Sequence, residues 1–512
     1  MKDILAILVA TALFWLTAEL ALRGIYTARN AAVSTVVLPY TAAQDWGPVP
    51  PWIDGLRILE PDRLLLWRNR PGVERRYLDV YGPAFTETDR LELLQRFWPR
   101  VPATLRDRPT WSVSIGRRGF RTADFEDERA DGSFRVVCIG DSWTFGANVD
   151  QSDAFPQRLA ALLSAARPGA NVEVLNLGVM GYSSRQGLEL LRRRLAGLEA
   201  DVVVIGFAMN DSVVAGWHDR DSVGVEGPDP RGLLQRSEML RLARYLWQRA
   251  RYEPWTIGDY LARVSAAAGS EDELWTGRQA VEQADVEALE RLARVSPSEH
   301  EAHLREMLRL VRGRGAEAVL LYNELWSTPY RSSVARVAGD EGAHWVDAQA
   351  LIAAARDRRE QALAARLELE PAGSPADRMV LRVHQAGRRV PEALYVVSDH
   401  PELGDGVPNR VELRDDGRNG DERAGDGVWS KAVSLDPAER IYLVYTNSGR
   451  EGIWEGLDVP DLRHFVVPEQ PSYRPIETFG ELVLQADGWH PDAAGHGLLA
   501  RALFDHLLNR IP

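Results

Sequence analysis

Apolar and polar positions alternate along the chain in a way that predicts strands and helices in turn. Short apolar runs bounded by turns predict buried strands at residues 134–139, 172–176, 201–207 and 316–322. Between them, apolar residues recur three or four positions apart, which predicts helices with one buried face at residues 155–166, 185–198 and 300–314. Strands that alternate with helices predict a parallel sheet covered by helices on both faces.

Polar residues follow three of these strands at their carboxyl ends, where ligands bind in open parallel sheets. The loops are 140–146 (GDSWTFG), 176–183 (NLGVMGYS) and 208–211 (AMND). The first presents the hydroxyl of Ser142 directly after a buried strand, the second contains Gly181, and the third contains Asn210. A glycine N–H and an amide side chain can stabilise an oxyanion, so a serine nucleophile with an oxyanion hole is expected here. Taken alone, Asp-Ser is also an ordinary turn and helix-cap pair.

A base for such a serine must come from elsewhere in the chain. Residues 487–492 (DGWHPD) precede an amphipathic stretch that runs to about residue 508, and Pro491 and Asp492 suit the first turn of a helix. Asp487 and His490 are therefore expected in the turn just before that helix, where the carboxylate can hold the imidazole and fix its tautomer. The residues alone leave open a helix-start turn with an exposed histidine.

Together, the four blocks resemble those of the SGNH, or GDSL-type, hydrolases, and they occur in the order that this family requires. The resemblance covers about 131–215, 300–355 and 475–512. It implies that Ser142 is the nucleophile, His490 the general base and Asp487 the acid that orients it. It also implies an oxyanion hole formed by the Ser142 N–H, the Gly181 N–H and the Asn210 side chain.

The sequence departs from the family pattern at one position. Ala208 stands where the family usually has glycine, so the third loop differs there by a methyl group. Residues 116–121 (GRRGFR) resemble the lead-in of membrane-anchored members of the family. The chain has no GxSxG motif at its nucleophile block, which disfavours the nucleophile-elbow fold of the α/β-hydrolases.

The first segment of the chain is strongly apolar. Residues 4–22 carry one charge, Glu19, and are about as long as a bilayer core requires. A secretory signal peptide is the alternative, but the small-x-small cleavage pattern is poor because Leu16 and Glu19 stand where small residues are wanted. We therefore expect an uncleaved membrane anchor, with the rest of the protein outside the cytoplasm, or a secreted protein if the segment is cleaved.

Composition and spacing extend this organisation to the whole chain. Hydrophobic residues make up 45% of the 512 positions, which suits a globular protein. Asp211 and Asp487 lie far more residues apart than one connection needs, so the catalytic unit is expected to contain insertions. One is a helical insertion at about 230–298, whose tryptophan-rich face includes Trp247 and is expected to form a packed cap. The other, at 374–468, changes to strand-like alternation, with the clearest runs at 379–383, 394–397 and 441–445.

The predicted fold is thus a flavodoxin-like three-layer α/β/α core with an N-terminal membrane helix and an inserted β-sandwich. The expected units are an anchor or signal segment (1–26), a spacer and extension (27–130), the first part of the hydrolase core (131–373), the inserted β-domain (374–468) and the C-terminal part of the core (469–512). Within the spacer, residues 27–55 are expected to be an exposed linker, and a segment of the β-domain from 401 to 411 faintly resembles starch-binding modules.

One loop of the inserted domain is rich in acidic residues and glycine. Oxygen ligands spaced along it could wrap a calcium ion, although the spacing is not that of an EF-hand loop. A Gly/Asp hairpin turn is the favoured interpretation. The calcium candidates are Asp415, Asp416, Asn419, Asp421 and Asp426.

The net charge and the cysteine content of the chain exclude some classes of binding partner and bound metal. The formal net charge of -13 would repel a phosphate backbone, so nucleic acid is not an expected partner. A single cysteine, Cys138, excludes an intramolecular disulfide and a thiolate cluster. The chemistry implied by the resemblance needs no cofactor.

Three functions remain open at this point. The leading one is a serine esterase or deacylase that hydrolyses an O-acyl ester, with acetyl groups and acylated glycans or small molecules as candidate substrates. The second is a polysaccharide O-acetyltransferase that uses the same triad. The third is a catalytically inactive glycan-binding scaffold, which the intact Ser142, Asp487 and His490 disfavour.

Overall fold

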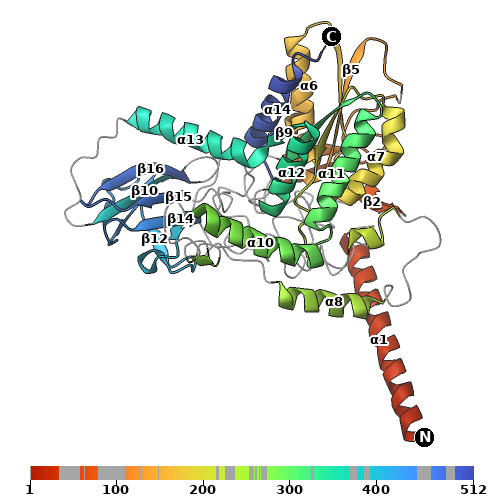
Figure 1. Ribbon diagram of the computed structural model, residues 1–512, viewed down its shortest axis with the longest axis horizontal. Helices are drawn as coiled ribbons and strands as arrows, with labels where there is room; N and C mark the ends of the chain where they lie inside the picture. The colour runs from red at the N-terminus through yellow and green to blue at the C-terminus, as the bar shows by residue number, and fades with distance from the viewer. Residues whose placement is uncertain are drawn as a thin grey trace.

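A computed structural model describes most of the chain. It covers residues 2–33, 58–62, 64–78, 110–126, 128–147, 149–214, 218–224, 237–252, 259, 262, 263, 266, 274–324, 328–367, 378–385, 393–446, 463–479 and 490–511. Figure 1 shows helix α1 projecting from the body of the protein and the long helix α13 reaching from the parallel sheet toward a second group of strands.

The body of the protein is a five-stranded parallel sheet in the order β6-β5-β7-β8-β9. This is the flavodoxin-like order, in which the first strand lies between the second and the third. The strands are β5 (Ser133–Gly140), β6 (Asn171–Asn176), β7 (Val202–Gly206), β8 (Glu317–Tyr322) and β9 (His344–Asp347). The predicted fold class is confirmed, and β9 is a strand that the apolar pattern did not reveal.

Alternate residues of one strand serve two separate cores. Val137 and Ile139 of β5 pack in one hydrophobic core, while Val136 and Cys138 pack in the other. Successive side chains of a strand point to opposite faces of the sheet, so a strand buried on both faces is mostly apolar. The first core is covered by α7 (Ser184–Leu198), α11 (Pro297–Arg312) and α12 (Thr328–Glu341), and the second by α6 (Phe155–Ala166), α13 (Ala348–Leu367) and α14 (Ala493–Leu507).

A second group of strands shares one hydrophobic core of its own. The three-stranded sheet has the order β13-β10-β16 and the four-stranded sheet the order β12-β11-β14-β15. Leu381 and Val383 of the first sheet and Val396, Leu443 and Tyr445 of the second belong to the same core, as in two sheets packed face to face. The strands are β10 (Met379–Gln385), β11 (Leu394–Val397), β12 (Val411–Leu413), β13 (Val428–Val433), β14 (Arg440–Thr446), β15 (Arg463–Val466) and β16 (Tyr473–Phe479).

Glu360 joins helix α13 to this second group of strands. Its carboxylate accepts hydrogen bonds from Arg463 Nη1 at 2.8 Å and from the Thr478 N–H at 2.9 Å and hydroxyl at 3.0 Å. Arg463 is buried, and it also donates to the Thr478 carbonyl at 2.7 Å. One carboxylate therefore holds the last two described strands, β15 and β16, against a helix that covers the parallel sheet.

The N-terminal part consists of a long helix followed by two hairpins. Helix α1 (Lys2–Val33) continues past residue 26 and takes up the beginning of the predicted linker, while residues 34–57 lie outside the described part of the chain. The window Lys2–Gly24 has a mean hydropathy of 2.1 and none of it is buried in the protein, so this helix is long and apolar enough to cross a membrane. The hairpin strands are β1 (Leu59–Asp62) with β2 (Leu66–Asn69), and β3 (Glu74–Leu78) with β4 (Thr110–Ser114).

Two further helices are described between β7 and α11. They are α8 (Glu238–Arg251) and α10 (Leu274–Leu292), both within the predicted helical insertion. Helix α8 lies beside α1, as Figure 1 also shows. A cap that was packed throughout would bury Trp247, but its side chain is 52% exposed, so the expectation of a packed tryptophan-rich face is wrong at this residue.

Candidate active site

The loop after β5 places Ser142 at the first position of the short helix α5 (Ser142–Phe145). Asp141 caps this helix, because its Oδ1 accepts a hydrogen bond from the Trp143 N–H at 2.9 Å. His490 lies opposite, with its Nε2 2.9 Å from the Ser142 Oγ. The two side chains are 348 positions apart in the chain, and the fold brings them within hydrogen-bonding distance.

The start of α14 determines where His490 lies. Asp492 is the N-cap of this helix and accepts hydrogen bonds from the N–H groups of Ala494 at 2.8 Å and Gly495 at 2.9 Å. The sequence placed Asp492 inside the first turn, whereas the structure makes it the cap, which the side chain of aspartate suits well. Asp487, the predicted orienting acid, lies outside the described residues.

A buried carboxylate links the strand-end loops of the sheet. Asp141 accepts hydrogen bonds from Asn210 Nδ2 at 3.2 Å, after β7, and from Asn323 Nδ2 at 2.8 Å, after β8. Burial raises the pKa of Asp141 to about 6, against the opposing effects of these donors and of the nearby His490. Asn210 thus lies beside the residue that precedes Ser142 and keeps a second N–H on its amide nitrogen.

The glycines of the second loop are required by close packing and by backbone shape. A Cβ at Gly178 would lie 2.2 Å from the main-chain nitrogen of Phe145, so only glycine lets this loop approach helix α5. Gly181 has a φ of +78°, in the left-handed region that favours glycine. The capping box of Ser183 and Gln186 then starts helix α7.

The N-terminal hairpin β1–β2 supports this second loop. Trp67 Nε1 donates to the Met180 carbonyl at 2.9 Å, and Asn69 Nδ2 donates to the Gly178 carbonyl at 3.0 Å. The Tyr182 hydroxyl in turn donates a hydrogen bond of 2.7 Å to the Trp67 carbonyl. The region expected to be a spacer therefore contributes side chains that fix the shape of the glycine loop.

A buried ion pair holds the same loop from the other side. Arg294 donates to the Gly181 carbonyl at 3.0 Å and to Asp219 Oδ2 at 2.9 Å, and both side chains are almost entirely buried. The Ser183 hydroxyl also donates to Asp219 at 2.5 Å. Arg294 and Asp219 come from the segments beyond β7, so the catalytic unit draws on them as well.

Arg121 anchors the turn that follows α5. It is fully buried, and its guanidinium donates to the carbonyls of Phe145 at 2.9 Å, Val149 at 2.7 Å and Ser112 at 2.7 Å, and to that of Gly146. It is the last residue of the GRRGFR segment at 116–121. The structure thus gives that segment a physical role, because it clamps the chain just beyond Ser142.

A second polar cluster is buried behind the third loop. Asp211 accepts a hydrogen bond from the Ser184 N–H at 2.7 Å, and burial raises its pKa to about 8. The Ser184 hydroxyl lies 2.9 Å from His303 Nδ1, and burial lowers the pKa of both His303 and His300 to about 4. These histidines are therefore neutral near pH 7, and the cluster lies within the packed helices α7 and α11.

Sequence reasoning missed several residues of the site. Asn323 directly follows β8, so the rule that pointed to Asn210 at the end of β7 would have found it. Trp67, Arg121 and Arg294 carried no comparable signal, because each acts through main-chain carbonyls whose position depends on the folded loops.

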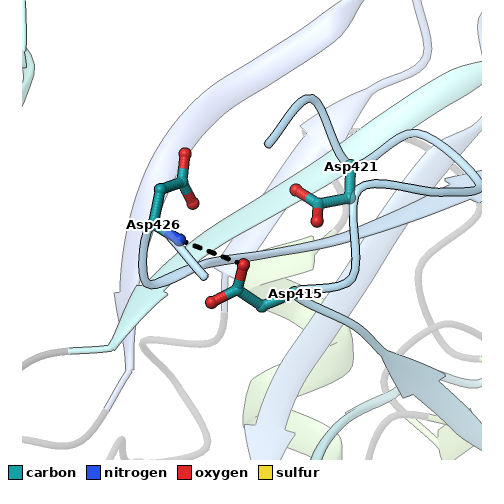
Figure 2. Close-up of side chains that lie close together, drawn as sticks. All are labelled: Asp415, Asp421 and Asp426. Carbon is teal, nitrogen blue, oxygen red and sulfur yellow. Dashed lines mark hydrogen bonds between the residues drawn. The ribbon is translucent and has the colours of Figure 1, made fainter. Parts of the chain in front are cut away.

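Three of the calcium candidates come together in the inserted domain (Figure 2). One oxygen from each of Asp415, Asp421 and Asp426 lies within 4.8 Å of the others. Asp415 already accepts hydrogen bonds from the N–H groups of Gly425 at 2.5 Å, Asp426 at 3.2 Å and Gly427 at 3.0 Å. This pattern is typical of a carboxylate that closes an Asp/Gly-rich turn.

A comparison with known protein families identifies a domain in this chain. Residues 138–374 match the model of the GDSL-like lipase/acylhydrolase family. The chain carries a GDSL-like lipase/acylhydrolase domain. This domain makes the protein an ester-hydrolysing enzyme, as the sequence predicted, and the matched segment contains both Ser142 and Asn210. No curated protein matches the sequence.

A comparison with solved structures finds esterases and hydrolases of low sequence identity. LAE5, an alpha/beta hydrolase enzyme from the metagenome of Lake Arreo, Spain, is 17% identical over 49% of this chain and 88% of its own, with a TM-score of 0.25. A catalytic mutant of Axe2, an acetylxylan esterase from Geobacillus stearothermophilus, is 16% identical over 43% and 78%, with a TM-score of 0.24. The psychrotrophic esterase EstA from Pseudoalteromonas sp. is 13% identical over 43% and 80%, with a TM-score of 0.24.

Proposed function

We propose that the GDSL-like domain hydrolyses an O-acyl ester through Ser142, His490 and Asp487. The observation that carries the proposal is the 2.9 Å distance between the Ser142 Oγ and His490 Nε2. A serine hydroxyl is a weak nucleophile at neutral pH, and a neighbouring imidazole activates it by accepting its proton. The strand-end position of Ser142 supports the same role, since ligands of such sheets bind there.

Each proton has a defined destination in the proposed reaction. The Ser142 Oγ attacks the acyl carbon while its proton moves to His490 Nε2. The tetrahedral intermediate then collapses to an acyl-serine, and Nε2 gives the proton to the leaving alkoxide oxygen. In the second half, a water molecule gives a proton to His490 Nε2 and attacks the acyl carbon. The carboxylic acid is released, and the Ser142 oxygen takes the proton back from Nε2. With Nε2 facing Ser142, Nδ1 is the ring nitrogen that an orienting carboxylate would hold, and we assign that role to Asp487 on the family resemblance.

The oxyanion donors are assigned to the Ser142 N–H, the Gly181 N–H and the second N–H of the Asn210 amide. Asn210 supports this assignment because its first N–H is directed to Asp141, next to Ser142, which fixes the amide near the reacting atom. Such donors typically contribute about 2.7 kcal/mol or more each to transition-state stabilisation. Asn210→Ala is therefore expected to reduce kcat by about 100-fold or more, since each 1.36 kcal/mol corresponds to tenfold in rate.

We place the enzyme on the outer side of a membrane, held by helix α1. Its apolar window Lys2–Gly24 supports an anchor, and Glu19 within it makes hydrogen bonds to the folded part of the protein at Ser237 and Met239. A signal sequence that is cut off would not retain these contacts. Acylated glycans at the cell surface are then accessible substrates, and acetyl is the acyl group that we would test first.

The test compares Ser142→Ala with Ser184→Ala. Both hydroxyls lie 2.9 Å from a histidine nitrogen, but the Ser184 hydroxyl is fully buried against His303, between helices α7 and α11, so it is a matched control. We expect a fluorophosphonate to label the wild type and Ser184→Ala and to fail on Ser142→Ala, with turnover of short-chain esters and acetylated oligosaccharides lost in parallel. Labelling that persists in Ser142→Ala would refute the assignment. Transfer of acetyl to a sugar hydroxyl in preference to water would identify an acetyltransferase instead.

A further inference from the structure

Helix α8 exposes an apolar stripe. Ala243, Leu246, Trp247 and Ala250 follow the spacing of one helix face, and all four are exposed, Leu246 by 56% and Trp247 by 52%. In the described residues outside α1, four large hydrophobic side chains are exposed, and Leu246 and Trp247 are two of them.

The other side of α8 contrasts with this stripe. Gln248, adjacent to Trp247 in the chain, is 1% exposed, and Ser237 at the N-cap is also buried. A helix on the surface of a water-soluble protein normally turns its apolar face to the core and its polar face outward. Helix α8 does the opposite at these positions, which indicates an apolar or interfacial environment on its outer side.

The N-terminus of α8 is attached to the candidate membrane helix. Glu19 Oε2 accepts hydrogen bonds from the Ser237 hydroxyl at 2.9 Å and from the Met239 N–H at 3.1 Å. Glu19 lies within the last turns of the apolar window Lys2–Gly24. The first turn of α8 is therefore held at the level where the apolar part of α1 ends, and Figure 1 shows one end of α8 against α1.

The charges around the stripe suit a lipid surface. Residues 238–251 contain four arginines and one glutamate, although the whole chain has a net charge of -13. Arg244 and Arg251 are exposed beside the stripe, and the Arg251 guanidinium lies 4.3 Å from the centre of the Trp247 ring. Exposed arginine and tryptophan next to aliphatic residues are the composition of helices that lie in the membrane interface and bind anionic headgroups.

We propose that α8 lies in the headgroup region of the bilayer that holds α1, with Ala243, Leu246, Trp247 and Ala250 at the acyl boundary and with Arg244 and Arg251 among the lipid phosphates. This inference rests on the membrane anchoring proposed above and is independent of the catalytic assignment. The hydrolase domain then has a second attachment to the membrane beside its anchor, so its orientation relative to the lipid surface is fixed.

The test uses the full chain in nanodiscs of phosphatidylcholine and phosphatidylglycerol. An environment-sensitive fluorophore is attached at Leu246→Cys, and quenching by a headgroup-spin-labelled lipid is measured. Cys138 is buried and should remain unlabelled. The matched control is Val466→Cys, an exposed apolar position of the inserted domain, and Leu13→Cys in α1 with an acyl-chain spin label reports on the anchor. Turnover of a soluble ester shows that each variant is folded.

We expect the fluorophore at position 246 to lose most of its emission to the headgroup label and the one at position 466 to keep it. Equal, weak quenching at both positions, with strong quenching at position 13, would overturn the proposal for α8 and leave the anchor intact. Weak quenching at position 13 as well would overturn the anchoring on which it rests.

Discussion

The indole N–H of Trp67 donates a hydrogen bond of 2.9 Å to the main-chain carbonyl of Met180. That carbonyl and the Gly181 N–H belong to the same peptide unit, and all described peptide bonds are trans. In a trans peptide the C=O and N–H bonds point in opposite directions. Trp67 therefore determines the direction of the Gly181 N–H, which we assign to the oxyanion hole.

Trp67→Phe keeps an aromatic ring and removes this donor. A hydrogen bond contributes about 0.5–1.5 kcal/mol, so kcat should fall about 2- to 12-fold while KM changes little. The rate of fluorophosphonate labelling should fall in parallel. Tyr182→Phe is the control, because it removes the bond from the Tyr182 hydroxyl to the Trp67 carbonyl without touching the Met180–Gly181 peptide. Equal losses of kcat in both variants would mean that the hairpin acts only through stability.

Arg121 should be essential for stability, because its buried guanidinium holds the turn that follows α5. Arg121→Ala leaves several main-chain carbonyls around the α5 turn without their charged donor, and hydrogen bonds to charged groups contribute about 1.5–3 kcal/mol each. We expect the free energy of unfolding to fall by about 3 kcal/mol or more, measured by denaturant titration. Arg117→Ala, in the same motif but on the surface, should change the free energy of unfolding far less, because its ion pair with Asp124 is exposed to solvent. A small loss at Arg121 would contradict the clamp.

Asp211 should make the protein less stable as the pH rises. Its pKa is about 8 in the folded protein and near 3.9 in an unfolded chain. Between these values the folded state binds a proton that the unfolded state does not, so the free energy of unfolding falls across this pH range. Asp211→Asn keeps an acceptor for the Ser184 N–H, and its melting temperature should exceed that of the wild type by a margin that grows from about pH 5 to about pH 8. The control is Asp340→Asn at an exposed position, which should show no such pH-dependent difference in melting temperature. A difference between Asp211→Asn and the wild type that does not change with pH would contradict the raised pKa of Asp211.

The contacts of Glu360 should hold the inserted strands in place. Glu360→Ala removes the nearer carboxylate beside the buried Arg463, at 2.8 Å, and leaves Glu477 at 3.9 Å. It also removes the acceptor of the two Thr478 hydrogen bonds, so β15 and β16 lose their attachment to α13. Hydrogen exchange should accelerate in β15 and β16 and stay unchanged in β5. Arg336→Ala breaks an exposed ion pair with Glu301 on the core helices and should change neither region. Uniform acceleration throughout the protein would show that the insert and the core unfold as one unit.

The acidic loop of the inserted domain should be stable without metal. Asp415→Asn is expected to lower the melting temperature, because it weakens the hydrogen bonds from the Gly425 and Gly427 N–H groups. The decrease should be the same in a chelator and in about 1 mM calcium, a concentration that would load a typical extracellular calcium site. A rise in the wild-type melting temperature with calcium that Asp421→Asn abolishes would instead identify a calcium site.

The sequence predicted the parts of the fold whose chemistry is local. Strands β5 and β7 are buried on both faces, and β7 and the segment Val136–Ile139 of β5 are continuous apolar runs, so both strands stood out. Strand β9 is four residues long and has one buried position, so it shows no apolar run that would predict a strand. Strand β15 buries Arg463 where an apolar residue would be expected, and β16 contains Pro475, so neither showed regular alternation.

Some residues of the candidate site could be predicted from the sequence and others could not. The four motif blocks suggested Ser142 and His490, but only the folded chain shows the 2.9 Å between them. Trp67 and Arg294 bind carbonyls of the glycine loop, and no spacing in the sequence relates them to it. Contacts of a side chain with distant backbone leave no periodic signal, so they emerge from coordinates alone.

The distance in sequence between Ser142 and His490 has a consequence for biosynthesis. While a ribosome has completed the chain only as far as the inserted strands, the nascent protein contains the serine but not the imidazole that meets it. In the reaction proposed above, the Ser142 hydroxyl gains its base only after α14 has docked, when the polypeptide has moved beyond residue 490. A newly made chain would therefore hold the serine without its partner until this helix is in place.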